Sequence, residues 1–168
     1  MGIMEYFSRK KENRFTFEQL EAYLNSHYFA KANSLLNGNV SYVNEAWVDE
    51  LAQTIISKGK EIQLATKRWD KNDKFEEASV LLMDSEQKYD VSFEEHYKKP
   101  HADAIAKVTK QKHLSPAQIS YLLGEIDETH KEVTEFKEGL NKKIGAMHVT
   151  LYAARLSSAP EQAPAMKK

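Results

Sequence analysis

The sequence predicts an all-α fold: an elongated helical bundle with two long antiparallel, coiled-coil-like helices and shorter helices packed at one end. Apolar residues recur at alternating steps of three and four, which is the period of a helix buried along one side. The 168-residue chain has only six glycines and four prolines to interrupt helices. No stretch shows the sustained alternation of apolar and polar residues that marks a half-buried strand.

The first predicted helix begins after Thr16. The stretch T-F-E-Q pairs a capping threonine with Gln19 three residues later, which is the pattern of a capping box. Apolar residues follow at helical spacing as far as Leu36, and Gly38 is suited to end the helix. The polar pair Asn25-Ser26 leaves open a division of this stretch into two helices.

The second helical region runs from about Asn44 to Tyr89. Its first half carries an apolar stripe formed by Val48, Leu51, Ile55, Ile62, Ala65 and Trp69. Gly59 lies inside the stripe and weakens the helix by about 1 kcal/mol relative to alanine. The polar run W-D-K-N-D-K predicts either two helices or one long helix with a soft point near Asp70–Asp73.

Two shorter helices are expected next. The stretch S-F-E-E predicts a helix that starts at Phe93, and Pro100 is expected to stop it, because proline disfavours helix in the preceding residue. One or two further turns are predicted over 102–108. The clearest start follows at Ser115, which precedes Pro116 at the first helical position.

The longest predicted helix runs from Pro116 to Arg155 and would span about 60 Å. Its stripe consists of Ile119, Leu122, Ile126, Thr129, Val133, Phe136 and Leu140, and continues after a register shift as Ile144, Met147, Leu151 and Ala154. A four-residue step at Leu140 resembles a stutter in a coiled coil. We expect Ile126, Val133, Phe136 and Leu140 to be buried, with the segment 44–89 as the partner of similar length.

Length and composition predict one helical domain over residues 15–157. An N-terminal amphipathic and basic segment, 1–14, precedes it, and a Pro/Ala-rich tail, 158–168, is expected to be flexible. The N-terminal segment is not expected to be a secretory signal, because its apolar residues precede its charges.

The N-terminal segment holds the candidate partner-docking residues Ile3, Met4 and Phe7, which share one side if the segment is helical. A basic run that includes Arg9, Lys10 and Lys11 follows. We favour docking on protein, either on this chain or on a partner. A weak foot on an anionic membrane is the alternative.

Residue types exclude several chemistries. The chain has no cysteine, which rules out disulfides, thiolate nucleophiles and cysteine-based metal sites and fits a cytoplasmic location. Gly-rich phosphate loops and nucleophile motifs are absent. The best metal-like groupings, Glu94–His96 with His101 and Asp103, and Asp127 with His130, lack the spacing of known metal sites. We therefore expect no cofactor, no metal and no catalytic residues.

Charge is arranged locally, since the net charge is only −1. A candidate basic patch comprises Arg9, Lys10, Lys11, Lys98, Lys99, Lys107, Lys110 and Lys112. Residues 117–139 are mainly acidic. The preferred interpretation is that the basic and acidic stretches flank each other or face solvent.

These features favour a non-enzymatic scaffold or adaptor that acts by helix-mediated protein–protein interaction. The alternative is a regulator that binds nucleic acid or an anionic membrane surface through its basic segments, and a metal-dependent helical-bundle enzyme ranks last. The expected partners are another protein and a second copy of the chain as a homodimer. Nucleic acid and peripheral membrane contact are not favoured. Partner identity, organism and pathway are not encoded in recognisable motifs.

Overall fold

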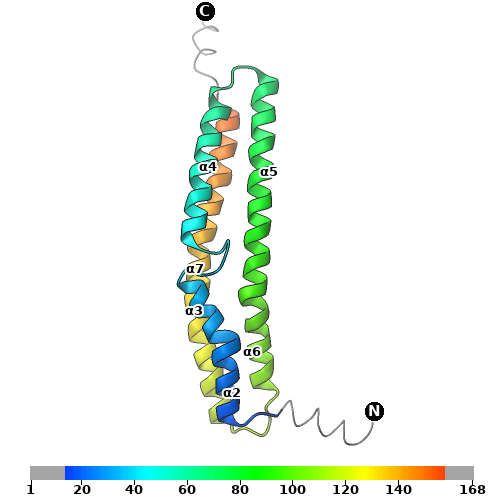
Figure 1. The fold of residues 1–168 in the computed structure, drawn as a ribbon, viewed down its shortest axis with the longest axis vertical. Coiled ribbons are helices and arrows are strands. Elements are labelled where there is room, and N and C mark those ends of the chain that lie inside the picture. The colour runs from blue at the N-terminus through cyan, green and yellow to red at the C-terminus, as the bar shows by residue number, and fades with distance from the viewer. Residues whose placement is uncertain (1–13, 158–168) are drawn as a thin grey trace, which may run out of the picture. The chain divides into compact units, whose positions relative to one another are not determined.

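The computed structural model describes residues 14–157, which are helical apart from short connections (Figure 1). Among these residues there is no β-strand, so the predicted all-α class is confirmed. None of their helices is both long enough and apolar enough to cross a membrane. In chain order the elements are α2 (Phe17–Leu24), the π-helix η1 (Asn25–Phe29), α3 (Ala30–Leu36), α4 (Glu45–Leu64), α5 (Arg68–Phe93), the π-helix η2 (Glu94–Lys98), α6 (Lys99–Thr109) and α7 (Pro116–Leu156).

Two predicted helix starts are confirmed by the hydrogen bonds at their caps. The Thr16 hydroxyl accepts from the Gln19 backbone N–H at 3.1 Å, and the Gln19 side-chain oxygen accepts from the Thr16 N–H at 3.0 Å. Ser115 and Gln118 make the same reciprocal pair at the start of α7. Each box satisfies two backbone amides that would otherwise lack a partner near the helix terminus.

The helical path through α2, η1 and α3 continues across Asn25-Ser26, so the division into two helices that the sequence left open does not occur there. The backbone widens by one residue instead, and the Ala30 N–H donates to the Asn25 carbonyl. The Ser26 hydroxyl donates to the Ala22 carbonyl at 3.2 Å, so this polar side chain bonds to its own helix rather than ending it. Gly38 follows α3 with a φ of 77°, as expected of a residue beyond a helix end.

The predicted helix start at Phe93 and stop at Pro100 are both wrong. Elements α5, η2 and α6 follow one another without a connection. The Ser92 hydroxyl donates to the Ser41 carbonyl at 2.6 Å instead of opening a new helix. Pro100 lies in the first turn of α6, directly after the π-helix, where the Lys99 N–H donates to Glu94. The first turn of a helix tolerates proline because its amide is not needed there.

The region 44–89 forms two helices, α4 and α5, which is the first of the two predicted alternatives. The break lies at 65–67 rather than near Asp70–Asp73, which sits inside the first turns of α5. Ala65 ends α4 with an extended backbone. Acidic side chains such as Asp70 are favourable near a helix N-terminus, so the polar run starts a helix rather than softening one. Trp69 is 64% exposed and is not a core residue, contrary to the predicted stripe.

Residue contacts divide the chain into two compact units, which are described separately below. Within the described residues, unit 1 holds 14–37 and 93–135, and unit 2 holds 38–92 and 136–157. Helix α7 therefore contributes its first half to unit 1 and its second half to unit 2. Each unit is built from segments that are distant in the sequence.

Unit 2 buries aliphatic side chains from α4, α5 and α7. Its core includes Val48, Leu51, Ile55, Ile62, Ala78, Leu82, Leu140, Ile144, Met147 and Leu151. Gly59 is buried where α4 meets α7: a Cβ atom added to it would lie 3.3 Å from Thr150 Cγ2. The glycine that weakens α4 locally thus permits a close approach of the two helices.

The register shift predicted in α7 is confirmed, because Leu140 and Ile144 are both buried. Ile126 and Val133 are fully buried as expected. Phe136 is only partly buried, so its predicted place in the core is wrong. The step from Leu140 to Ile144 is four residues, where the alternating pattern would give three. This extra residue keeps the stripe buried, because a helix has 3.6 residues per turn and a strict seven-residue stripe drifts around it.

Candidate functional site

The centre of unit 1 is a chain of hydrogen bonds between aromatic side chains. The two π-helices each supply one buried tyrosine, Tyr28 from η1 and Tyr97 from η2, and their hydroxyls lie 2.7 Å apart. The Tyr28 hydroxyl also lies 3.3 Å from the carbonyl of Ile126, and the Tyr97 hydroxyl lies 2.7 Å from His130 Nδ1. We call Tyr28, Tyr97, His101 and His130 the tyrosine–histidine cluster.

The proton count fixes the direction of this chain. Each tyrosine hydroxyl has one proton to donate, and the Ile126 carbonyl can only accept. All three contacts are satisfied together only if His130 Nδ1–H donates to Tyr97, Tyr97 donates to Tyr28, and Tyr28 donates to Ile126. Nδ1 of His130 therefore carries a proton in this arrangement.

His101 completes the cluster by stacking. Its ring lies 4.2 Å from that of His130, centroid to centroid, with 13° between the planes, and it also stacks on Tyr97 at 5.5 Å. Burial, followed by the neighbouring His130, lowers the pKa of His101, while Asp127 opposes the shift. The ring is thus held in its neutral form near pH 7.

The two tyrosine hydroxyls of the cluster lack the pKa of a working acid or base. Burial raises the pKa of both Tyr28 and Tyr97, so their hydroxyls stay protonated over the ordinary pH range. An acid or base that works near neutral pH needs a pKa close to that pH. Every buried side-chain polar atom in the described residues has a hydrogen-bond partner. We interpret the cluster as a structural core.

The metal-like groupings named from the sequence are only partly brought together. His101 and His130 lie side by side, but as stacked rings, and Nδ1 of His130 is bonded to Tyr97. Asp103 accepts a hydrogen bond from the Tyr23 hydroxyl. Among residues 14–157, no three histidine or carboxylate side chains lie where they could hold one ion.

The candidate basic residues of unit 1 lie at both ends of α6. Lys98 and Lys99 flank its start, and Lys110 and Lys112 follow its end; all four are exposed. From Lys99 to Lys110 the helix rises about 16 Å, which exceeds the screening length of about 8 Å at physiological salt. The fifth lysine, Lys107, lies with its Nζ 5.4 Å from the Tyr23 ring.

The remaining predicted site residues lie outside the described part of the chain. They are the candidate docking residues Ile3, Met4 and Phe7 and the basic residues Arg9, Lys10 and Lys11. Their roles stay predictions.

A groove of ≈ 280 Å³ opens on unit 1 between the first helical run and the first half of α7. Its apolar lining includes Leu24, Phe29, Tyr121 and Leu122, and its charged residues are Glu21 and Glu125. Two carboxylates and no basic side chain line it, so we call it the acidic groove. Ligand pockets span roughly 300–1,000 Å³, so this volume suits a few side chains better than a whole cofactor.

Unit 2 carries a row of exposed apolar side chains on α7. Val149 is 68% exposed, Tyr152 60% and Leu156 65%, at the spacing i, i+3 and i+7 that places residues on one side of a helix. We call these three residues the α7 row. The neighbouring residues Met147, Leu151 and Ala154 are buried, so α7 has apolar residues on two sides.

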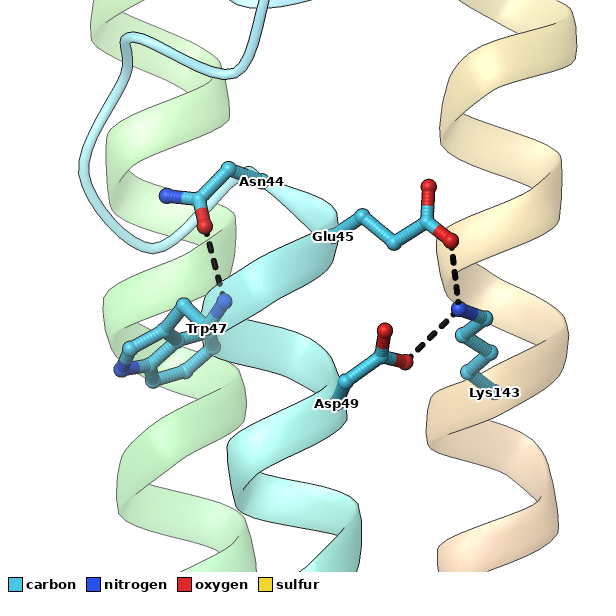
Figure 2. A network of polar contacts seen from close by, with 5 residues as sticks. All are labelled: Asn44, Glu45, Trp47, Asp49 and Lys143. Carbon is cyan, nitrogen blue, oxygen red and sulfur yellow. Dashed lines mark hydrogen bonds and ion pairs between the residues drawn. The ribbon is translucent and has the colours of Figure 1, made fainter.

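A network of polar contacts fixes α7 to the start of α4 in unit 2 (Figure 2). Lys143 Nζ lies 3.1 Å from a Glu45 carboxylate oxygen and 2.7 Å from one of Asp49. The hydrogen bonds to Asp49 and Glu45 raise the pKa of Lys143. In the same view the Asn44 side chain accepts from the Trp47 N–H at 2.8 Å and caps α4. The contacts link α4 to the helix that carries the α7 row.

Sequence reasoning missed the tyrosine–histidine cluster and the α7 row. In the cluster, Tyr28 and Tyr97 are 69 positions apart in the sequence, and Tyr97 and His130 are 33 positions apart. No local sequence pattern links residues at such separations. Only the i, i+4 pair of Tyr97 and His101 was visible as a local signal. The second stripe Val149-Tyr152-Leu156 was present in the sequence, beside the stripe assigned to the core.

Comparison with known proteins returned no match. No family model, no curated protein and no solved structure matches the chain. The function must therefore be argued from the residues themselves.

Proposed function

We propose that this protein is a non-enzymatic scaffold or adaptor that acts by helix-mediated protein–protein interaction in the cytoplasm. The observation that carries the proposal is the α7 row, because three large apolar side chains on one side of a helix are each at least 60% exposed. Single exposed apolar residues are ordinary, but a regular row favours a binding face for a partner helix.

The core of unit 2 supports this interpretation, because it does not need the α7 row. Ile144, Met147 and Leu151 already provide the second half of α7 with a buried stripe. The ion pair of Lys143 with Asp49 also links α7 to α4 without using the α7 row. A side chain that the core does not use is available for a partner.

We also propose that α5 and the second half of α7 form the antiparallel, coiled-coil-like pair expected from the sequence. The Lys71 ammonium donates to the Ser157 carbonyl, and the Tyr89 hydroxyl donates to the Asn141 side chain, each at 2.7 Å. Residue numbers thus rise along α5 as they fall along α7. Such a pair would present the α7 row on a stiff support.

The experiment is site-specific photo-crosslinking in the native host. A photoreactive residue at Tyr152 should give a discrete crosslinked product, and the same residue at Lys142, an exposed position of α7, should give less of it. Val149→Asp in the Tyr152 chain should reduce the product, because it charges the row. Equal crosslinking from both positions would contradict the proposal.

The crosslinked product, together with a binding assay for DNA and anionic liposomes, separates the alternatives. A product with the mass of two copies of this chain would identify the predicted homodimer. Binding to DNA or to anionic liposomes that falls steeply with salt, with no protein crosslink, would favour the regulator that uses basic segments.

A further inference from the structure

The acidic groove has a chemistry that selects its occupant. Phe29 and Tyr121 supply aromatic faces, Leu24 and Leu122 supply aliphatic contact, and the charged lining is entirely acidic. Glu18 and Glu128 are exposed one helical turn from Glu21 and Glu125, and extend the negative charge beyond the groove. A segment that combines large apolar side chains with basic ones fits this surface.

The N-terminal segment of this chain has that combination. Ile3, Met4 and Phe7 supply apolar side chains, and the basic run follows them directly. Across residues 3–14, four basic residues stand against two acidic ones. Its charge is opposite to that of the groove.

The described chain begins beside the groove. The Phe15 N–H donates to the Gln111 side-chain oxygen at 3.0 Å, and the Phe15 carbonyl is bound by His113 Nε2 at 2.6 Å. Two residues later the Phe17 ring lies 6.2 Å from the Tyr121 ring, which lines the groove. The N-terminal segment therefore joins unit 1 at a residue that is held by hydrogen bonds. This residue lies two positions before Phe17, whose ring is next to the groove wall.

The N-terminal segment is long enough to reach the acidic groove. Seven Cα-to-Cα steps lead from Phe7 to Arg14, and an extended chain spans at most about 25 Å over seven steps. The groove runs along the first helical run from Glu21 toward Asn33, a rise of about 18 Å. A tethered segment also has a high effective concentration at a site on the same chain, which favours it over a free competitor.

We propose that residues 3–11 of this chain bind in the acidic groove of unit 1. The apolar side chains of Ile3, Met4 and Phe7 contact the Phe29 and Tyr121 walls, and the basic run lies against Glu21 and Glu125. This inference is independent of the proposed function, since the groove belongs to unit 1 and the α7 row to unit 2.

The test uses the full chain with one spin label. The chain has no cysteine, so Gly2→Cys accepts a nitroxide at a single site. We expect the amide NMR signals of Asn25 and Glu125 to broaden, and those of Ile144 and Leu151 in unit 2 to stay sharp. Reduction of the nitroxide should restore the broadened signals.

Charge reversal tests whether the basic run is attracted to the carboxylates of the acidic groove. Glu21→Lys combined with Glu125→Lys should lower the ratio of docked to free segment about tenfold, because two attractive pairs become repulsive. Adding Arg9→Glu, Lys10→Glu and Lys11→Glu to that chain should restore docking. Glu50→Lys with Glu138→Lys makes the same charge change at exposed positions of unit 2 and should have no effect.

Three outcomes would overturn the proposal. The first is that the signals of Asn25 and Glu125 stay sharp, or that they broaden equally in the natural chain and in the charge-reversal variant. The second is broadening that appears in a mixture of spin-labelled and isotope-labelled chains and rises with concentration, since the segment would then bind a second copy. The third is recruitment of residues 3–11 to anionic liposomes with the groove signals unchanged.

Discussion

Unit 1 and unit 2 both bury aliphatic side chains, but the core of unit 1 also contains a hydrogen-bonded pair of buried tyrosines. Unit 2 packs aliphatic side chains such as Ile55, Leu82 and Ile144, whose contacts have no preferred direction. Unit 1 buries Tyr28 and Tyr97 at its centre, where each hydroxyl must find a partner in a fixed direction. The comparison teaches that periodicity identifies the apolar part of each core, such as Ile126 in unit 1 and Ile144 in unit 2, whereas the buried hydrogen bonds of unit 1 depend on contacts that periodicity does not contain.

The largest effect should come from a large-to-small change in the aliphatic core. Ile55 is fully buried, so Ile55→Ala should reduce the free energy of unfolding by about 2–5 kcal/mol through lost burial and a cavity. Urea unfolding followed by circular dichroism measures the change. Val149→Ala removes methyl groups from an exposed site and should stay within about 0.5 kcal/mol of the natural chain. Similar losses in the two variants would show that the α7 row is part of a core.

Removing one hydroxyl from unit 1 should have the next largest effect. Tyr97→Phe leaves Tyr28 without its donor and His130 without its acceptor, which should cost about 1–3 kcal/mol. Tyr121→Phe, on an exposed ring, should change stability by less than about 0.5 kcal/mol.

The double variant Tyr28→Phe/Tyr97→Phe sharpens the result. It should be less destabilised than the sum of the two single changes, because removing both partners leaves fewer unsatisfied groups. Strict additivity would mean that the two hydroxyls act independently and would remove the basis of the comparison.

The helix content and the stripe of α7 were predictable because both rest on local spacing. The capping boxes at Thr16 and Ser115 marked two starts correctly for the same reason. The π-helices were not predictable, since the wide turn at Asn25 brings Tyr28 toward a partner 69 residues away. Pro100 was misread because a local rule for proline takes no account of its place in a first turn after η2. The candidate site shares this limit, as the acidic groove joins α7 to a distant segment.

Glycine substitutions on α7 and α4 should give smaller effects that depend on packing. Gly145 is exposed, and no atom outside its own stretch of helix backbone lies within 4 Å of the position that a Cβ would take. Gly145→Ala should therefore stabilise unit 2 by about 0.5–1 kcal/mol through helix propensity. Gly59→Ala should gain less or lose stability, because its Cβ would meet Thr150 Cγ2 at 3.3 Å. Adding Thr150→Ser removes that methyl group and should recover part of the gain. Equal stabilisation by both alanines would contradict the close approach of α4 and α7.

The smallest expected effect is a pH dependence in unit 1. The pKa of His101 is lowered below 6.5 in the folded chain, so the unfolded chain binds its proton first as the pH falls. The contribution of His101 to stability is complete above pH 6.5 and is lost as the pH falls from there through the folded pKa. The groups that face the ring are Tyr28, Tyr97, His130 and Asp127.

Urea midpoints measured between about pH 7.5 and 5 check this sign. Substitution by His101→Gln should flatten the fall in stability at low pH, while the contributions of other titrating groups remain in both chains. A slope that is unchanged by the substitution would show that His101 titrates alike in the folded and unfolded chains.

The most direct test of the central claim measures the affinity of the crosslinked partner for two matched variants. Tyr152→Glu charges the α7 row, and Tyr121→Glu makes the same change on an exposed tyrosine of the same helix in unit 1. We expect Tyr152→Glu to weaken binding at least about tenfold, as loss of an aromatic anchor at an interface does, while its urea midpoint stays unchanged. Tyr121→Glu should leave the affinity unaltered. Equal affinities for the two variants, or a Tyr152→Glu chain that binds normally, would contradict the claim that the α7 row is the docking face.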